Sequence, residues 1–237
     1  MADRARPRPT LILLPPLPCG AEFYAAQVDG LSDLVNLEVI VADEPTIAAN
    51  VAKVLAAAPP EFFLAGTAYG GCVAIEIAVT APERLAGLWL MNCNPGPHPD
   101  PPDAKEISVR ALGGEYRAIM EGWSQVIVAE NATAARDRFL AMAHDAGAVR
   151  FARQHDASAG RADHWADLQR LAAPTLLLWG EDDRFVPLEV GRRIADAMPH
   201  ARFATLQGCR HFPTLEQPQA TMEIVRDWLS GILSSRD

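Results

Sequence analysis

The chain has 237 residues, of which 49% are hydrophobic and 22% are charged, and its formal net charge is −9. This length suits one sizeable α/β domain, and the composition is typical of a soluble globular protein rather than a disordered or membrane-embedded one. The acidic balance argues against nucleic acid or an anionic membrane as a partner.

The amino terminus, Met1 to Pro9, is rich in arginine and proline and lacks the apolar segment of a secretory leader. No later apolar run approaches the roughly 20 residues that span a bilayer, so we expect a cytoplasmic protein. Neither the cysteines nor the histidines show metal-ligand spacing, and we expect no metal and no cofactor. The cysteines are Cys19, Cys72, Cys93 and Cys209.

Six short apolar runs alternate with helical patterns along the chain. Their nearly continuous hydrophobicity predicts strands covered on both faces, and the alternation with helices predicts a mainly parallel sheet. The predicted fold class is therefore α/β, with helices on both faces of the sheet. The predicted strands are Thr10 to Leu14, Leu37 to Val41, Phe62 to Ala65, Leu88 to Asn92, Thr175 to Trp179 and Arg202 to Leu206.

Three segments predict helices, two from their apolar spacing and one from its nearly continuous hydrophobicity. Apolar residues recur with helical period from Ile47 to Leu55 and from Met222 to Ile232, which predicts helices that pack one face onto the sheet. The segment from Gly71 to Val79 is apolar almost all round, as expected for a buried helix, and Ala81-Pro82 ends it.

The alternation stops after Asn92, where a proline-rich passage, residues 94–102, can continue neither a helix nor a central strand. The segment from Ala104 to Leu171 contains no convincing strand and predicts three or four helices. We therefore expect residues 97–171 to form a helical lid over the carboxyl ends of the strands. Residues 1–96 and 172–237 would form the core.

The most informative motif is Gly66-Thr67-Ala68-Tyr69-Gly70, which follows a predicted strand. It fits the G-x-S-x-G nucleophile elbow except that alanine stands where the serine should be. Thr67 and Tyr69 carry hydroxyls, but neighbouring side chains on an elbow point elsewhere, so neither is expected to replace the serine. The elbow glycines permit a sharp turn between strand and helix.

Two further motifs follow later strands: Gly180-Glu181-Asp182-Asp183-Arg184-Phe185-Val186-Pro187 and Gly208-Cys209-Arg210-His211-Phe212-Pro213. The order nucleophile, acid, histidine is that of the α/β-hydrolase triad. Over essentially its full length the sequence resembles the α/β-hydrolase superfamily, and it is most similar to small capped carboxylesterases and meta-cleavage-product hydrolases. The resemblance implies that Asp183, rather than Asp182, is the acid and that His211 is the general base.

The resemblance also implies an oxyanion hole. Its donors would be the backbone N–H groups of Leu17 and Tyr69, with Ala68 at the nucleophile position. Two departures accompany it. Pro15-Pro16 stands where relatives have His-Gly, and a plain turn is the alternative interpretation there. Arg210 replaces the usual glycine before the histidine, which could narrow the site or bring a cation near it.

The lid supplies candidate substrate contacts, although core packing explains the same residues. They are Trp123, Tyr116, Met120 and Phe151. Its arginines leave an anionic acid group conceivable, but a solvated face balanced by acidic residues is the favoured interpretation. These arginines are Arg110, Arg117, Arg136, Arg138, Arg150 and Arg153.

Three interpretations of Ala68 compete. The favoured one is a serine hydrolase acting on a carboxylic ester of a small, largely apolar substrate, inactivated by a serine-to-alanine change that leaves a substrate-trapping form. The second is a natural pseudo-hydrolase that binds a small ligand. The third is a lyase or cofactor-free oxygenase that needs only His211 and Asp183. Retention of His211 and Asp183 favours the first interpretation. The sequence does not indicate the oligomeric state, for which a homodimer is one option.

Overall fold

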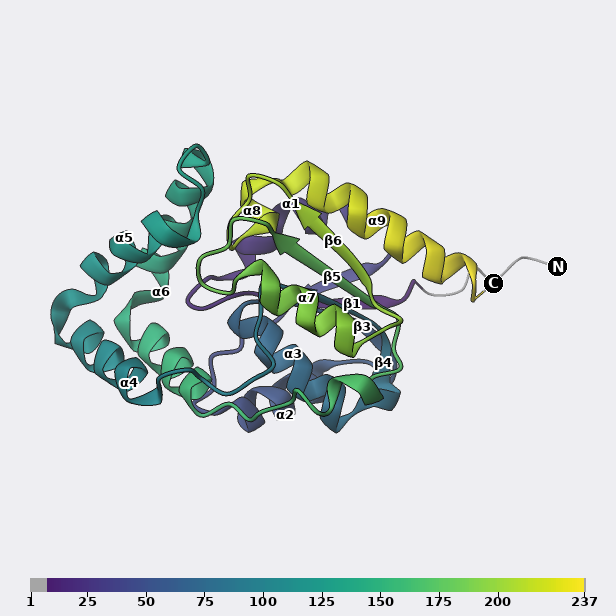
Figure 1. Ribbon diagram of the computed structural model, residues 1–237, viewed down its shortest axis with the longest axis horizontal. Coiled ribbons are helices and arrows are strands. Elements are labelled where there is room, and N and C mark those ends of the chain that lie inside the picture. Colours follow the sequence, from purple (N-terminus) through teal and green to yellow (C-terminus); the bar gives the residue numbers. More distant parts are fainter. Residues whose placement is uncertain (1–7, 237) are drawn as a thin grey trace.

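The computed structural model describes residues 8–236. Met1 to Pro7, on which part of the leader-peptide expectation rests, lie outside the described residues. Six strands form one sheet in the order β2-β1-β3-β4-β5-β6 (Figure 1), and every neighbouring pair is parallel. The strands are β1 (Thr10–Leu14), β2 (Asn36–Val39), β3 (Phe62–Thr67), β4 (Leu85–Met91), β5 (Thr175–Gly180) and β6 (Arg202–Leu206).

The predicted α/β class with a parallel sheet is confirmed, and the strand limits differ only at some ends. β1 and β6 have the predicted limits, whereas β4 begins at Leu85 and ends at Met91. The predicted strand extended to Asn92, but Asn92 has φ 46°. This left-handed conformation cannot continue a strand, and it turns the chain at the carboxyl end of β4.

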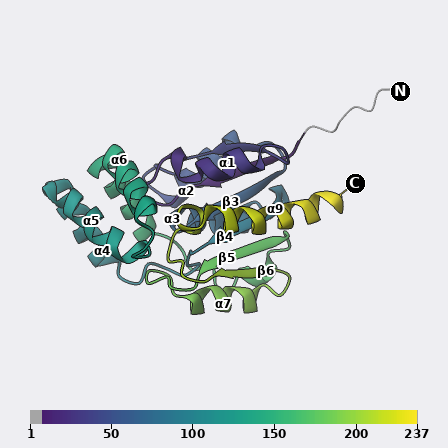
Figure 2. The same ribbon diagram turned by 90° about the horizontal axis from the view of Figure 1, so that it is seen from above.

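Alternate residues of the buried strands enter two separate cores. Leu11 and Leu13 of β1 pack on the side of α1 (Ala25–Leu31) and α9 (Pro218–Ser234). Ile12 and Leu14 pack on the opposite side, with α2 (Ile47–Ala57), α3 (Tyr69–Thr80) and α7 (Leu188–Ala197). Figure 1 shows α1 and α9 on one side of the sheet and α2, α3 and α7 on the other, and Figure 2 looks onto the sheet from the side of α9. The sheet is thus covered on both faces, which explains its continuous hydrophobicity.

Between β4 and β5 the chain is mainly helical, and these helices, here called the lid, lie beyond the end of the sheet toward which the strands point (Figure 1). α4 continues through a π-helical turn (η3, Ala111–Glu115) into α5, and α6 is kinked at Gly147, where φ is 72°. Asp100 caps α4 by accepting a hydrogen bond from the Asp103 N–H. The helices are α4 (Pro101–Arg110), α5 (Tyr116–Ile127) and α6 (Thr133–Ala159).

Short helical segments complete the part of the chain that the structure describes. They are η1 (Ala21–Tyr24), η2 (Pro82–Arg84), η4 (Leu168–Arg170) and α8 (Pro213–Glu216). No helix within residues 8–236 combines the length and hydrophobicity needed to cross a membrane.

Candidate active site

Ala68 lies on a strained turn between β3 and α3. Its backbone has φ 51° and ψ −115°, a conformation that side-chain-bearing residues adopt only at a cost. The flanking glycines permit the turn because a Cβ on Gly70 would overlap the Leu14 carbonyl, and one on Gly66 would overlap the Gly70 carbonyl. The chain therefore keeps the geometry of a nucleophile elbow with a methyl group at its tip.

The hydroxyls next to Ala68 are already engaged elsewhere. Thr67 is fully buried, and its Oγ1 lies 2.8 Å from the Tyr24 hydroxyl. The Tyr69 hydroxyl accepts a hydrogen bond from the Asn50 amide at 3.0 Å. Neither oxygen is placed to act as a nucleophile at the elbow.

Asp183 and His211 meet at the carboxyl ends of β5 and β6. His211 Nδ1 lies 2.7 Å from Asp183 Oδ2, and the Asp183 side chain is completely buried. Asp183 Oδ1 accepts the backbone N–H groups of Phe185 at 2.8 Å and Val186 at 3.1 Å. Burial alone would raise the pKa of Asp183, but His211 and these hydrogen bonds outweigh it and lower the pKa. The carboxylate is thus held ionised beside the histidine, whereas Asp182 has no part in this contact.

Asn92 is a third member of the site that the sequence analysis did not identify. Its amide donates to Asp183 Oδ2 at 2.6 Å and to the Arg210 carbonyl at 3.3 Å. The left-handed backbone of Asn92 directs the side chain toward Asp183 from the end of β4. Its position directly after a buried parallel strand is the signal that could have identified it.

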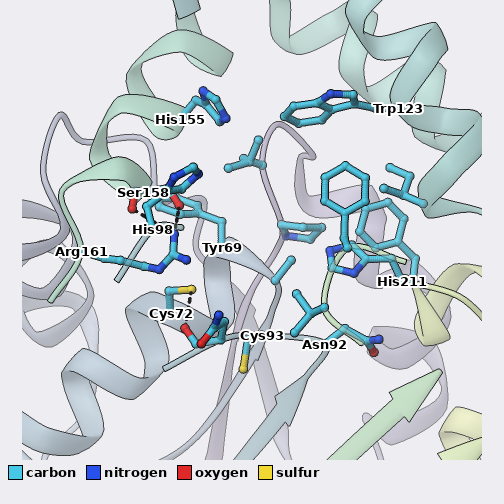
Figure 3. Close-up of a pocket in the computed structure, with 18 of the residues that line it drawn as sticks. Tyr69, Cys72, Asn92, Cys93, His98, Trp123, His155, Ser158, Arg161 and His211 are labelled. Carbon is cyan, nitrogen blue, oxygen red and sulfur yellow. Dashed lines mark hydrogen bonds between the residues drawn. The ribbon is translucent and has the colours of Figure 1, made fainter. Parts of the chain in front are cut away.

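A cavity of about 200 Å³ opens over Ala68 and His211 (Figure 3). Leu17 and Tyr69, the predicted oxyanion residues, both line it. The Leu17 N–H donates no hydrogen bond to any acceptor within residues 8–236. The Phe185 and Phe212 rings lie beside His211, at 5.5 and 5.1 Å between centroids. The other aromatic and aliphatic side chains of the wall are Leu17, Trp123, Ile127 and Val186.

Of the four lid residues proposed as substrate contacts, the structure brings only Trp123 to the cavity. Tyr116, Met120 and Phe151 are buried in the core beneath the lid. Phe151 packs against the Trp123 ring at 5.3 Å between centroids, and the Tyr116 hydroxyl donates to the Ala143 carbonyl. Helical periodicity identified these residues as inward-facing, but it could not separate the cavity wall from the layer behind it.

Arg210 does not enter the cavity, which corrects the expectation that it narrows the site. Its guanidinium donates to the carbonyls of Gln125 at 2.8 Å and Val128 at 2.9 Å, at the carboxyl end of α5. The adjacent His211 N–H donates to the Ile127 carbonyl at 3.0 Å. Arg210 therefore ties the histidine loop to the lid.

Polar residues of the lid and the β4–α4 loop line the side of the cavity away from His211 (Figure 3). No sequence pattern indicated these residues, because only the folded lid brings them together. They are His98, His155, Ser158 and Arg161. Within the described part of the chain, no three His, Cys, Asp or Glu side chains are grouped so that they could hold a metal ion.

A parallel sheet with a strained elbow after β3 and an acid–histidine pair after β5 and β6 is the α/β-hydrolase architecture. Residues 7–224 match the model of the alpha/beta hydrolase family, and the chain belongs to that family.

Related proteins are named as hydrolases of several kinds. A 2-hydroxy-6-oxononadienedioate/2-hydroxy-6-oxononatrienedioate hydrolase from Cupriavidus pinatubonensis is 29% identical over 177 residues, 70% of this chain. This chain spans 61% of that relative's length. An esterase from Thermogutta terrifontis, solved with malate bound, is 25% identical with a TM-score of 0.83, covering 95% of this chain and 91% of its own. The enol-lactonase from Burkholderia xenovorans LB400 shares the fold, with 20% identity and a TM-score of 0.86 over 96% of this chain and 94% of its own.

Proposed function

We propose that this site is that of a serine-type carboxylic ester hydrolase in which alanine occupies the nucleophile position. One observation carries the proposal. Ala68 has a strained φ of 51°, and it lines the same cavity as His211. A residue without a reactive atom gains nothing from this strain. A serine at the same position would present its hydroxyl to the cavity.

The remaining parts suit ester hydrolysis. Asp183 holds Nδ1 of His211, which leaves Nε2 to take a proton from a hydroxyl at position 68 and to return it to the leaving group. The N–H groups of Leu17 and Tyr69 would stabilise the oxyanion. The apolar wall beside His211 suits a small, largely apolar alcohol or acyl group. The relatives named as an esterase and as a 2-hydroxy-6-oxononadienedioate/2-hydroxy-6-oxononatrienedioate hydrolase support hydrolysis as the reaction class.

The test is Ala68→Ser, assayed on short 4-nitrophenyl esters with the alanine form as the control. Removal of a triad serine costs on the order of 10⁶ in turnover, so the serine form should be active and the alanine form nearly inert. Ala68→Ser combined with His211→Ala should be inert again. The proposal would be overturned if the serine form folded but hydrolysed no ester, thioester, amide or lactone.

A second candidate is an enzyme that uses His211 as a base without any nucleophile. It is favoured by the intact 2.7 Å contact between His211 and Asp183 in a chain that has Ala68. Such an enzyme would exchange an acidic C–H proton of a carbonyl compound, such as ethyl acetoacetate, with solvent deuterium. Activity of the alanine form that disappears in His211→Ala would support this candidate. Ligand binding that is indifferent to His211→Ala, without any turnover, would instead support a pseudo-hydrolase.

A further inference from the structure

Arg161 gives the cavity a positive charge that no acidic residue of the wall offsets. It is the one arginine on the wall, which contains no lysine, aspartate or glutamate among the described residues. The Arg161 guanidinium lies on the side of the cavity away from His211 (Figure 3). A ligand that reaches from Ala68 to this side would meet a cation.

All protein partners of the Arg161 guanidinium are neutral. Nε donates to the Gly96 carbonyl at 2.9 Å, and one terminal nitrogen donates to the Ser158 carbonyl at 3.1 Å and its Oγ at 3.0 Å. The other terminal nitrogen donates to the Pro97 carbonyl at 3.3 Å. Since a guanidinium has five N–H groups, one remains for a ligand, and these contacts hold the guanidinium in place.

Glu76, a candidate counter-ion for Arg161, is already committed to another residue. Arg161 and Glu76 both line a small hollow beside the cavity, but the Glu76 carboxylate lies 2.7 Å from His164 Nε2. Within residues 8–236, no carboxylate approaches Arg161 to ion-pair distance. The charge of Arg161 therefore lacks an internal partner.

Two further groups beside Arg161 can donate hydrogen bonds. His98 Nδ1 accepts the Asp100 N–H at 3.1 Å, so in the neutral ring the proton is on Nε2. Burial, and then the charge of Arg161, lower the pKa of His98, which keeps the ring neutral at pH 7. The Ser158 hydroxyl accepts from Arg161, and its own proton stays available.

We propose that Arg161, His98 and Ser158, here called the donor cluster, bind a carboxylate at the end of the substrate remote from the ester. The substrate would then be an ester or lactone that also carries a free carboxyl group, such as a half-ester of a dicarboxylic acid. This inference rests on the proposed function for the ester end. One arginine with neutral donors balances the single charge of a carboxylate, whereas a phosphate carries a charge of about −2.

Binding to the alanine form tests the inference without turnover. Calorimetric titration would use the monomethyl esters of succinic, glutaric and adipic acids, with the dimethyl esters as neutral counterparts. At least one monoester should bind on the order of tenfold or more tightly than its diester. Arg161→Gln should remove this preference, since hydrogen bonds to charged groups are worth roughly 10- to 100-fold in affinity.

Control variants separate binding from folding. Arg153→Gln removes the same charge from an exposed position of the lid, where Arg153 does not line the cavity, and should leave the preference intact. Arg161 also bonds Gly96 and Pro97, so Ser158→Ala serves as a milder variant and should weaken only the monoester. Equal affinity for monoesters and diesters, or a preference unaffected by Arg161→Gln and Ser158→Ala, would overturn the inference.

The same ligands distinguish the two proposals. If Ala68→Ser is inert on every ester while the alanine form prefers monoesters through Arg161, the ester hydrolase proposal fails and the donor cluster stands. If Ala68→Ser hydrolyses dimethyl and monomethyl esters with equal kcat/KM, the donor-cluster proposal fails and the hydrolase proposal stands. Tighter binding of inorganic phosphate than of the monoesters would also overturn the assignment to a carboxylate.

Discussion

At the scale of single residues, the elbow keeps a strained backbone conformation around a side chain that has no reactive atom. Ala68 has the strained φ and ψ of a nucleophile position, although a methyl group cannot react. The surrounding strand, helix and glycine contacts impose this conformation, because a residue in a sparsely populated region persists only where its neighbours determine it. These neighbours thus hold position 68 in the conformation that would present a serine hydroxyl to the cavity.

We expect Ala68→Gly to raise the free energy of unfolding by about 1 kcal/mol. Relief of the strained φ contributes about 1–3 kcal/mol, and the greater freedom of glycine in the unfolded chain offsets about 0.4–1 kcal/mol of it. Urea unfolding of the two proteins measures the difference. A less stable glycine form would mean that Ala68 is not strained.

The elbow glycines give the opposite prediction. Gly70→Ala should lower the free energy of unfolding by about 2 kcal/mol or more, because the new Cβ meets the Leu14 and Pro15 carbonyls. Gly122→Ala in α5 is the matched control, because a Cβ added there would meet no atom within 4 Å. It should raise the free energy of unfolding by about 0.5–1 kcal/mol. Thermal and urea unfolding would check both. Equal effects of the two substitutions would contradict the close approach at Gly70.

At the scale of elements, the histidine loop and the lid form one hydrogen-bonded unit. Arg210 bonds the carboxyl end of α5, where the helix dipole favours a cation. Glu216 of α8 accepts the N–H groups of Ala129, Arg210 and Phe212. The loop that positions His211 is therefore held by the lid on one side and by α8 on the other.

Arg210→Ala should lower the free energy of unfolding by about 1.5–3 kcal/mol, because it removes buried hydrogen bonds to a charged group. Hydrogen exchange should become faster at the end of α5 and in residues 209–212. The control is Arg117→Ala, which removes an exposed arginine of α5. It should measurably change neither the free energy of unfolding nor the hydrogen exchange. Unchanged exchange in the histidine loop of a destabilised Arg210→Ala protein would contradict the link between lid and loop.

At the scale of the whole molecule, lid and core share a continuous hydrophobic interior. Phe139, Met142 and Phe151 of α6 belong to the same buried cluster as Phe23 and Phe212 of the core. A second connection lies where the lid returns to the sheet. The His164 ring hydrogen-bonds Glu76 of α3 at 2.7 Å and Asp167 at 3.1 Å. The backbone N–H of His164 donates to the Pro95 carbonyl at 2.9 Å.

This connection predicts a pH-dependent contribution to stability. Burial disfavours protonation of His164, but the hydrogen bonds to Glu76 and Asp167 outweigh it and raise the pKa above 6.5. A raised pKa in the folded state stabilises the protein at pH values below the unfolded pKa, and this contribution is lost as the pH rises through the folded pKa. His164→Gln should therefore cost more stability near about pH 5.5 than near about pH 8.5. Urea unfolding of both proteins at the two pH values would show an equal difference if the pair with Glu76 contributed nothing.

The sequence by itself determined the α/β class of the fold, and it placed the elbow motif, the acid motif and the histidine motif directly after predicted strands. This was possible because burial on both faces makes parallel strands continuous apolar runs, and because functional residues follow strand ends. Ala68 was singled out by the elbow pattern, whereas Asp183 and His211 were predicted from the resemblance of their motifs to those of the α/β-hydrolase superfamily.

Only the tertiary structure decided the composition of the cavity wall. Asn92 bonds Asp183 across 91 positions of sequence, and Arg161 meets His98 only because the lid folds back onto the β4–α4 loop. Helical periodicity gives the inward face of a lid helix but not what lies opposite it, so Tyr116, Met120 and Phe151 could not be separated from Trp123. The Arg210 side chain contacts the end of α5, whereas the Arg161 side chain lines the cavity. No pattern of charges along the chain distinguishes these two arginines.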